Sequence, residues 1–111
     1  MRIRSKMWVV EDNEVVFGDG RRRLLEILER TGSLNQAAKE LKMSYRAAWG
    51  KVKATEKRLG IKIVETHAGG RAGGGSTLTP EGKELLRKYK DFKQRANEAA
   101  DALFKEIFEE Q

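Results

Sequence analysis

The stretch GSLNQAAKELKMSYRAAWGKVK, residues 32–53, decides the fold of this 111-residue chain. Ser33 and Gln36 have the spacing of a capping box, so a helix is expected to begin directly after the serine. The paired alanines at 37–38 are small enough for another helix to cross at close range. Ser44 then stands in a position to cap that second helix. Two short helices joined in this way form a helix-turn-helix.

The flanking sequence predicts a mainly α chain with small β-hairpins, in the order of a winged helix-turn-helix. Asp19 can cap a first helix, and Gly32 and Gly60 are expected to end helices in the left-handed conformation. Thr79 and Pro80 suit the N-cap and the first position of a last helix. The predicted elements are strands at 7–10 and 15–17, helices at 20–31, from 34 and at 44–59, strands at 61–67 and 76–78, and a helix from 80 to about 110.

The last helix is long enough to extend beyond the rest of the domain. It spans about 45 Å at 1.5 Å per residue, whereas a domain of residues 1–79 is about 25 to 30 Å across. Residues 80–111 are expected to belong to the same structural unit and to form a long C-terminal dimerisation helix of a homodimer. The predicted seam has heptad spacing and comprises Leu85, Tyr89, Phe92, Ala96, Ala99 and Leu103. A second row, which comprises Leu86, Ala100, Phe104 and Phe108, lies beside it, and packing of both rows on the protein's own core is the alternative.

The net charge is +6, and the excess of positive charge lies in one part of the chain. Residues 1–79 hold 16 Lys/Arg against 9 Asp/Glu, whereas residues 80–111 hold 7 against 8. Such an excess favours a polyanionic partner, of which nucleic acid is the commonest. An anionic membrane surface and a simple role in solubility are the weaker alternatives.

Composition excludes most catalytic chemistry. The chain has no cysteine and a single histidine, so disulfide frameworks, thiolate nucleophiles, zinc sites and histidine-based triads are not expected. We therefore expect no cofactor and no enzymatic activity. No window approaches the roughly 18 unbroken apolar residues of a membrane span, and the N-terminus lacks the apolar centre of a signal peptide. We expect no membrane association, and we expect a cytoplasmic, nucleoid-associated location.

The helix predicted at 44–59 carries five Lys/Arg against one Asp/Glu. This charge lies off the inward stripe, which comprises Ala48, Val52, Thr55 and Leu59. Arg46 is suited to bidentate pairing with guanine, and Tyr45 and Trp49 offer apolar surface with polar tips. Core packing of Trp49 is an equal alternative. The predicted DNA-binding residues are Ser33, Gln36, Ser44, Tyr45, Arg46, Trp49, Gly50, Lys53 and Arg71.

Gly50 and the glycine-rich loop both suggest a close approach to phosphate. A glycine inside a helix costs about 1 kcal/mol relative to alanine, which suits a site where a phosphate approaches the backbone; simple tolerance is the alternative. A phosphate-binding Walker loop would need lysine where the stretch GRAGGGST, residues 70–77, has Ser76. The loop fits better as a wing, residues 68–76, whose amides and Arg71 lie on a phosphate ridge or in the minor groove. An ordinary hairpin is the alternative.

Two blocks of sequence resemble the N-terminal DNA-binding domain of the ModE family, the molybdate-responsive transcription regulators, whose helix-turn-helix is similar to that of LysR-type regulators. They are SYRAAW at 44–49 and GGRAGGG at 69–75, followed by LTPEG. The resemblance implies a winged-helix dimer that binds a palindromic operator through Ser44, Tyr45, Arg46 and the wing. Lys42 departs from the glycine that helix-turn-helix proteins often have in the turn.

The same resemblance bears on control by an effector. Members of that family carry a C-terminal molybdate-binding region of two small β-barrels, which this sequence does not contain. Three modes of control stay open: a separate protein senses the effector, this regulator responds to another signal, or it acts constitutively.

We therefore expect a sequence-specific, double-stranded-DNA-binding transcriptional regulator that acts as a homodimer. The helix at 44–59 would enter the major groove. Two other classes stay open: a nucleoid-type architectural DNA-binding protein of low sequence specificity, and a protein-interaction adaptor that uses the C-terminal helix.

Overall fold

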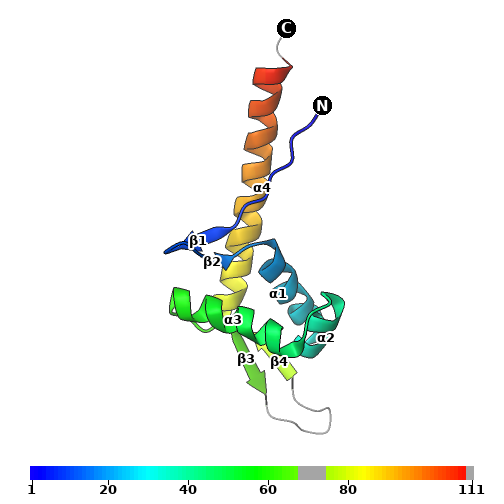
Figure 1. Cartoon of the computed structure of the whole chain (residues 1–111), viewed down its shortest axis with the longest axis vertical. Coiled ribbons are helices and arrows are strands. Elements are labelled where there is room, and N and C mark those ends of the chain that lie inside the picture. Colours follow the sequence, from blue (N-terminus) through cyan, green and yellow to red (C-terminus); the bar gives the residue numbers. More distant parts are fainter. Residues whose placement is uncertain (68–74, 110–111) are drawn as a thin grey trace.

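The computed structural model of the chain describes residues 1–67 and 75–109 and has overall dimensions of 65 × 28 × 24 Å. Short helices and two hairpins form one end of the molecule, and a single long helix projects from it (Figure 1). The elements are β1 (Val9–Glu11), β2 (Glu14–Phe17), α1 (Asp19–Thr31), α2 (Leu34–Glu40), α3 (Tyr45–Leu59), β3 (Val64–His67), β4 (Gly75–Leu78) and α4 (Pro80–Phe108). The predicted winged helix-turn-helix with a long last helix is confirmed.

Three predicted helix caps are present. The Ser33 hydroxyl accepts from the Gln36 amide at 3.0 Å, and the Ser44 hydroxyl accepts from the Ala47 amide at 3.0 Å. Thr79 accepts from the amide of the residue three positions later, with proline at the first position of α4. These side chains satisfy backbone donors that the first turn of a helix leaves free, so they determine where each helix begins.

Asp19 is not the cap of α1, contrary to the prediction. The helix begins at Asp19 itself, and Gly18 is the N-cap without a side-chain hydrogen bond. The Asp19 carboxylate accepts instead from Lys93 at 2.8 Å and from Arg22 at 3.2 Å. Because both donors are cationic, they hold the carboxylate more strongly than a helix amide would. The capping box at Ser33 is likewise only half formed, since the Gln36 side chain donates to Glu40.

The turn between α2 and α3 is made without glycine. Lys42 has φ of +57°, in the left-handed region, and its amide donates to the Lys39 carbonyl at 3.1 Å. The next amide, that of Met43, donates to the Ala38 carbonyl at 3.0 Å. The departure from glycine therefore leaves the turn intact, at a conformational cost of about 1 kcal/mol.

Both hairpins are two-stranded and antiparallel. In the first, Asp12 and Asn13 have positive φ, as a tight two-residue turn requires. In the second, Val64 pairs with Leu78 and His67 with Gly75. The strand predicted at 61–67 begins three residues later, at Val64. The residues just before it bond elsewhere: the Ile63 amide donates to Glu56 of α3, and the carbonyls of residues 62 and 63 accept from Thr79, the N-cap of α4.

One buried core holds the short helices, the hairpin bases and the first half of α4 together. Its buried side chains come from every helix and both hairpins, and the largest apolar ones that are fully buried are Phe17, Leu24, Leu25, Leu28, Leu34, Ile63, Val16, Val52 and Val64. Gly82 of α4 lies so close to Ile63 that a Cβ would stand 2.2 Å from the Ile63 carbonyl oxygen. Only glycine fits there, so α4 reaches the base of β3 without an intervening side chain.

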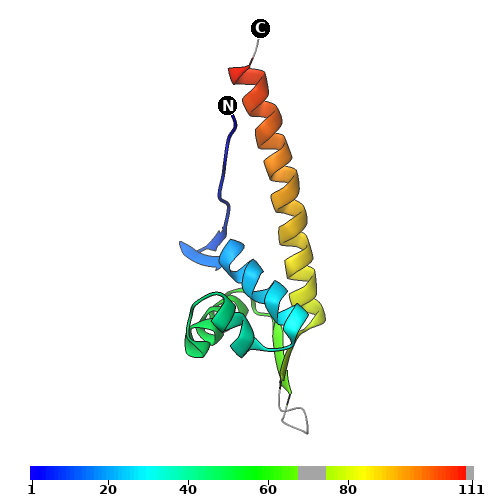
Figure 2. The ribbon, with the colours of Figure 1, turned by 90° about the vertical axis from the view of Figure 1, so that its right-hand side faces the viewer.

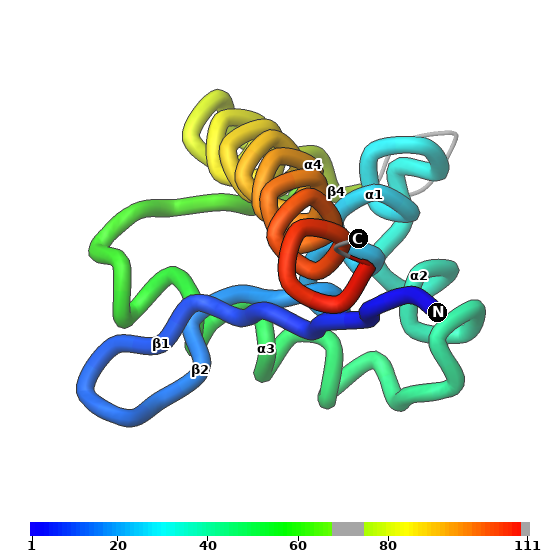
Figure 3. Tube along the Cα trace, turned by 90° about the horizontal axis from the view of Figure 1, so that it is seen from above, coloured from blue at the N-terminus to red at the C-terminus, as the bar shows by residue number. Residues whose placement is uncertain are grey.

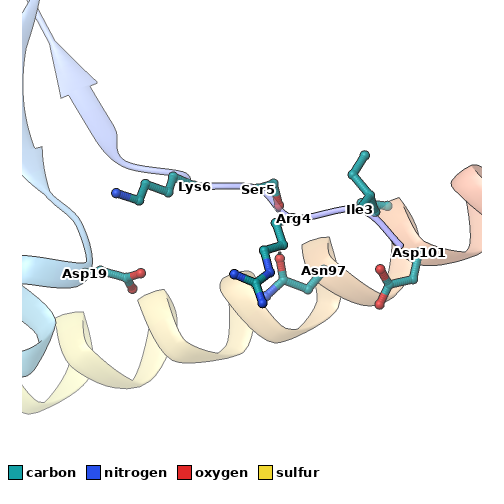
Figure 4. Close-up of a pocket in the computed structure, with 8 residues that line it drawn as sticks. Ile3, Arg4, Ser5, Lys6, Asp19, Asn97 and Asp101 are labelled. Carbon is teal, nitrogen blue, oxygen red and sulfur yellow. Dashed lines mark hydrogen bonds between the residues drawn. The ribbon is translucent and has the colours of Figure 1, made fainter. Parts of the chain in front are cut away.

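The distal half of α4 extends away from the core (Figure 2), and the N-terminal segment, residues 1–6, runs beside it. Figure 3, which looks down α4, shows this segment passing along one side of the helix. The Ser5 hydroxyl donates to the Asn97 side chain at 3.2 Å, and Figure 4 shows Ile3 and Arg4 over the same turns. This segment partly covers the second predicted apolar row.

The two rows predicted on α4 therefore have different surroundings. In the second row Leu86 is buried, Ala100 and Phe104 are half-buried, and Phe108 is exposed. In the first row Phe92 is 58% exposed and Leu103 is 54% exposed. The protein's own core covers the proximal part of α4 and leaves the distal part of the first row open to solvent.

Tyr89 corrects the predicted dimer seam. It is only 5% exposed, and its ring packs edge-on against Phe17 at a centroid distance of 5.2 Å. Its hydroxyl donates to the Met7 carbonyl at 2.9 Å and lies 3.2 Å from the Asp19 carboxylate. Burial raises the pKa of Tyr89, and the nearby Asp19 carboxylate adds to the shift. Tyr89 belongs to the core because α4 lies against α1 at this position.

Candidate nucleic-acid interface

The side chains that α3 buries in the core determine which of its faces is exposed to solvent. Ala48, Val52 and Thr55 are buried, as predicted, whereas Leu59 is only partly buried. The Thr55 hydroxyl donates to the Val16 carbonyl at 2.6 Å, which ties the helix to the base of the first hairpin. The outer face then presents Arg46, Gly50, Lys53 and Lys57, all exposed.

The first turn of α3 brings together three of the predicted residues. Ser44, Tyr45 and Arg46 are all exposed, and the Tyr45 ring is 48% exposed. The Ser44 oxygen accepts from a backbone amide, and its O–H still has a proton to donate outward. A hydroxyl, a phenol and a guanidinium at one helix end can read base edges and phosphates.

Trp49 packs partly against the core, one of the two alternatives, and its contact with DNA stays a prediction. It is half-buried and packs against the core, and the Tyr45 ring meets it edge-on at 6.4 Å between centroids. The Lys53 ammonium lies 5.1 Å from the Trp49 ring centroid, within range of a cation–π contact. Trp49 therefore supports the side chains that flank it on the exposed face.

Glu56 of α3 is a further residue beside the exposed face, and it was not among the predicted DNA-binding residues. One carboxylate oxygen lies 3.3 Å from the Lys53 ammonium. The other accepts from the backbone amides of Ile63 at 2.8 Å and Val64 at 3.2 Å. Burial opposes ionisation, but these donors outweigh it, so the pKa of Glu56 lies below its ordinary value. As the single acidic residue of a basic helix, it could have been noticed from the sequence.

The strands that flank the predicted wing, β3 and β4, lie at the same end of the molecule as α3, opposite the distal half of α4 and the N-terminus (Figure 1). The outward residues of its strands are exposed, and the His67 ring nitrogen Nε2 lies 2.8 Å from the Thr77 hydroxyl. Strand β4 is tied to the C-cap of α1, because the Ser76 amide donates to the Gly32 carbonyl at 3.0 Å. Arg71 and the rest of residues 68–74 lie outside the described residues.

The two predicted residues on α2 lie at its N-terminus. Ser33 is partly buried as the N-cap, and Gln36 is exposed. The Gln36 amide nitrogen Nε2 donates to Glu40 at 3.3 Å. An exposed glutamine one turn into α2 is available to a ligand that lies across the ends of α2 and α3.

A further basic cluster lies on the flank of α3 that faces the first hairpin. Arg21 donates from Nε to the Lys51 carbonyl at 3.5 Å. Burial lowers the pKa of Arg21, and the like charge of Arg58 adds to the shift. Arg58 in turn donates to the Val15 carbonyl at 2.7 Å and pairs with Glu14. Arg21 was not among the predicted DNA-binding residues, although it begins a run of three arginines.

The described part of the chain contains no group of three or more His, Cys, Asp or Glu side chains placed to hold a metal ion. Within residues 1–67 and 75–109, no helix combines the length and apolar character that a membrane span requires.

Comparisons with known proteins agree with this architecture. Residues 21–83 match the family "Bacterial regulatory helix-turn-helix protein, lysR family". "Molybdenum-pterin-binding protein MopB" of Rhodobacter capsulatus is 42% identical over 73% of this chain and 30% of its own length. "Molybdenum transport protein ModE" of Azotobacter vinelandii is 35% identical over 97% of this chain and 40% of its own. "Transcriptional regulator ModE" of Haemophilus influenzae is 40% identical over 78% and 34%.

The chain thus spans between 30% and 40% of the length of these three relatives, and the predicted resemblance to the ModE family is confirmed. Two solved structures share the fold at 23% sequence identity. The ArgP structure from Mycobacterium tuberculosis has a TM-score of 0.54 over 73% of this chain and 28% of that chain. The CbnR_DBD structure, from a complex with DNA, has a TM-score of 0.57 over 74% and 88%.

Proposed function

Because this chain belongs to the lysR family of bacterial regulatory helix-turn-helix proteins, we propose that it is a sequence-specific, double-stranded-DNA-binding regulator of transcription. The observation that carries the proposal is the basic outer face of α3, whose opposite face is locked into the core. Regulators of this kind place such a helix in the major groove. Binding of chromosomal DNA would locate the protein at the nucleoid.

Each part of the interface has a proposed role. Arg46 pairs with guanine, and Ser44 and Tyr45 contact neighbouring bases or phosphates. Lys53 and Lys57 neutralise phosphates along the groove. Gln36, near the N-terminus of α2, contacts the backbone on one side, and the wing, residues 68–76 with Arg71, contacts backbone or minor groove on the other.

The proposed regulator binds as a homodimer through the open row of α4. Phe92 and Leu103 are more than half exposed, and Ala99 is exposed between them. Apolar side chains at heptad spacing on an overhanging helix pack well against a second such helix. Two copies of α3 would then enter successive major grooves about 34 Å apart, on a two-fold-related site. Leu85 and Ala96 complete the seam proposed for this contact.

Control by an effector would come from outside the described residues. The names of the MopB and ModE relatives refer to molybdenum-pterin binding and molybdenum transport in those proteins. We propose that any comparable signal reaches this DNA-binding unit from a separate effector-sensing protein or from a region beyond this chain.

Selection of bound duplexes from a random pool, followed by competition against unselected DNA, tests the proposal. A specific regulator is expected to enrich a two-fold-symmetric sequence and to prefer it by at least about 10³-fold. A ratio near one would favour the architectural alternative. Failure to bind any duplex at low salt would refute DNA binding and favour the adaptor, which would use the exposed row of α4 instead.

A further inference from the structure

We propose that Glu56 is a positioning residue that sets the orientation of the wing hairpin relative to the recognition helix α3. The inference rests on the proposed DNA binding, because only then do both elements act on one ligand. Glu56 is on α3, and its carboxylate accepts from the Ile63 amide at 2.8 Å and from the Val64 amide at 3.2 Å. These two residues lie where the chain enters β3, so one side chain connects the two elements.

The two amides need this acceptor. Ile63 and Val64 are each 1% exposed, so water does not reach them freely. A buried amide without an acceptor is destabilising, and a carboxylate is a strong acceptor. Glu56 itself is also largely shielded, with its side chain 11% exposed. The contact between α3 and the start of β3 is therefore made by an acceptor oxygen in a protected position.

The same short segment is held from its other side by α4. The Thr79 amide donates to the Ile63 carbonyl at 3.0 Å. Gly82 approaches that carbonyl so closely that no side chain would fit between them. The entry to β3 is thus clamped between Glu56 and the first turn of α4, and loss of the Glu56 contact frees the side that faces α3.

Lys53 connects this clamp to the exposed basic face. Its ammonium lies 3.3 Å from the Glu56 oxygen that does not bind the amides. A phosphate near Lys53 would compete with Glu56 for the same ammonium. Glu56 therefore has two separable properties. Its negative charge attracts the Lys53 ammonium, and its reach, meaning the length of the side chain, brings an oxygen to the two amides.

Three substitutions separate charge from reach. Glu56→Gln removes the charge and keeps an acceptor oxygen at the same distance. Glu56→Asp keeps the charge and withdraws the oxygen by one methylene, and Glu56→Ala removes both. Glu65→Gln is the matched control, because Glu65 is an exposed acid on β3.

Amide hydrogen exchange on the full chain is the first measurement, and it needs no DNA. In Glu56→Asp and Glu56→Ala, exchange at Ile63 and Val64 is expected to accelerate by at least about tenfold, because the amides lose their acceptor. In Glu56→Gln and Glu65→Gln it should stay close to wild type. The Asp and Gln variants decide the matter even if Glu56→Ala does not fold.

Hydroxyl-radical footprinting on a selected duplex is the second measurement. Glu56→Asp should keep protection over the major-groove contact, lose it at the flanking backbone and bind about tenfold more weakly. Glu56→Gln should keep the whole footprint and bind at least as tightly as wild type, because Lys53 is released to phosphate. Equal behaviour of the Asp and Gln variants in both measurements would overturn the proposal. If wild-type protein binds no duplex, the proposed function fails, while hydrogen exchange still tests the clamp.

Discussion

The carboxylate of Asp19 joins parts of the chain that are far apart in sequence. It accepts from Lys93 at 2.8 Å and lies 3.2 Å from both Arg22 and the Tyr89 hydroxyl. The hydrogen bond from Lys93 is the main cause of a lowered pKa at Asp19; burial opposes it, and Arg22 and Tyr89 reinforce it. A single residue therefore holds the start of α1 against the middle of α4.

The lowered pKa predicts a pH-dependent contribution to stability. Because the folded pKa of Asp19 lies below the ordinary value of 3.8, stabilisation is complete above that value and is lost as pH falls through the folded pKa. Asp19→Asn should lower the free energy of unfolding at pH 7 by about 1 kcal/mol, a modest figure because the side chain is 42% exposed. Urea unfolding should show this difference from wild type shrinking below pH 3.8. A stability difference that stays constant with pH would contradict this role of Asp19. Asp91→Asn is the control, because Asp91 forms an exposed ion pair with Arg95.

Lys42 predicts a substitution that stabilises the protein. Its φ of +57° strains any residue with a Cβ, and the side chain is exposed. Lys42→Gly should raise the free energy of unfolding by up to about 0.5 kcal/mol, which is the relief of strain less the added entropy of the unfolded chain. Lys42→Ala removes the same charge, keeps the Cβ and should give no gain. Denaturant melts compare them, and equal gains would show that charge was the cause.

Among the elements, α3 is proposed to carry the recognition surface, because its buried stripe allows only one rotation of the helix about its own axis. Ala48 and Val52 are buried, and Thr55 bonds to the backbone of β2. The exposed cations on the opposite side, Arg46 and Lys57, therefore point into the same region of solvent. A helix free to rotate would present no constant surface to a base pair.

Substitutions on α3 should separate base reading from charge neutralisation. Arg46→Ala is expected to weaken binding to the selected site by about 1 to 3 kcal/mol and to relax preference at one base pair. Lys57→Ala should weaken all sequences alike and reduce the slope of log affinity against log salt by about 1. Lys88→Ala, on an exposed face of α4, is the charge-matched control. Fluorescence anisotropy at several salt concentrations measures all three, and identical effects of the two α3 substitutions would contradict the assignment.

At the scale of the whole molecule, the proximal and distal halves of α4 have different surroundings. Leu86 and Tyr89 anchor the proximal half in the core. The distal half projects from the domain, with the N-terminal segment along one side (Figures 2 and 3). The exposed row at Phe92 and Leu103 remains uncovered by the described part of the chain. The molecule thus presents its basic face at one end and an apolar face toward the other.

A charge placed in the exposed row should break the proposed dimer. Leu103→Glu is expected to give a monomer in analytical ultracentrifugation, because a buried carboxylate without a partner is costly at a helix–helix contact. Affinity for the two-fold site should fall toward that for a half-site, while half-site affinity stays unchanged. Gln94→Glu adds the same charge on the opposite side of α4 and should leave the dimer intact. A wild-type monomer at micromolar concentration would refute the dimer outright.

Features that depend on neighbours in sequence were predictable. The caps at Ser33, Ser44 and Thr79 and the left-handed ends at Gly32 and Gly60 all stand as the sequence indicated. Each involves atoms within four or five residues, so the local sequence is sufficient to specify it. The basic face of α3 follows in the same way, since helical periodicity determines which residues share a side.

Other features came only from the tertiary structure. Asp19 was expected to cap a helix and instead bonds to Lys93, and Tyr89 was expected at a seam and instead lies in the core. Glu56 bonds to backbone amides beyond the end of its own helix. A side chain with several competing partners takes the one that packing brings within reach. The sequence by itself therefore determined the elements and their order, and tertiary packing decided which polar groups meet.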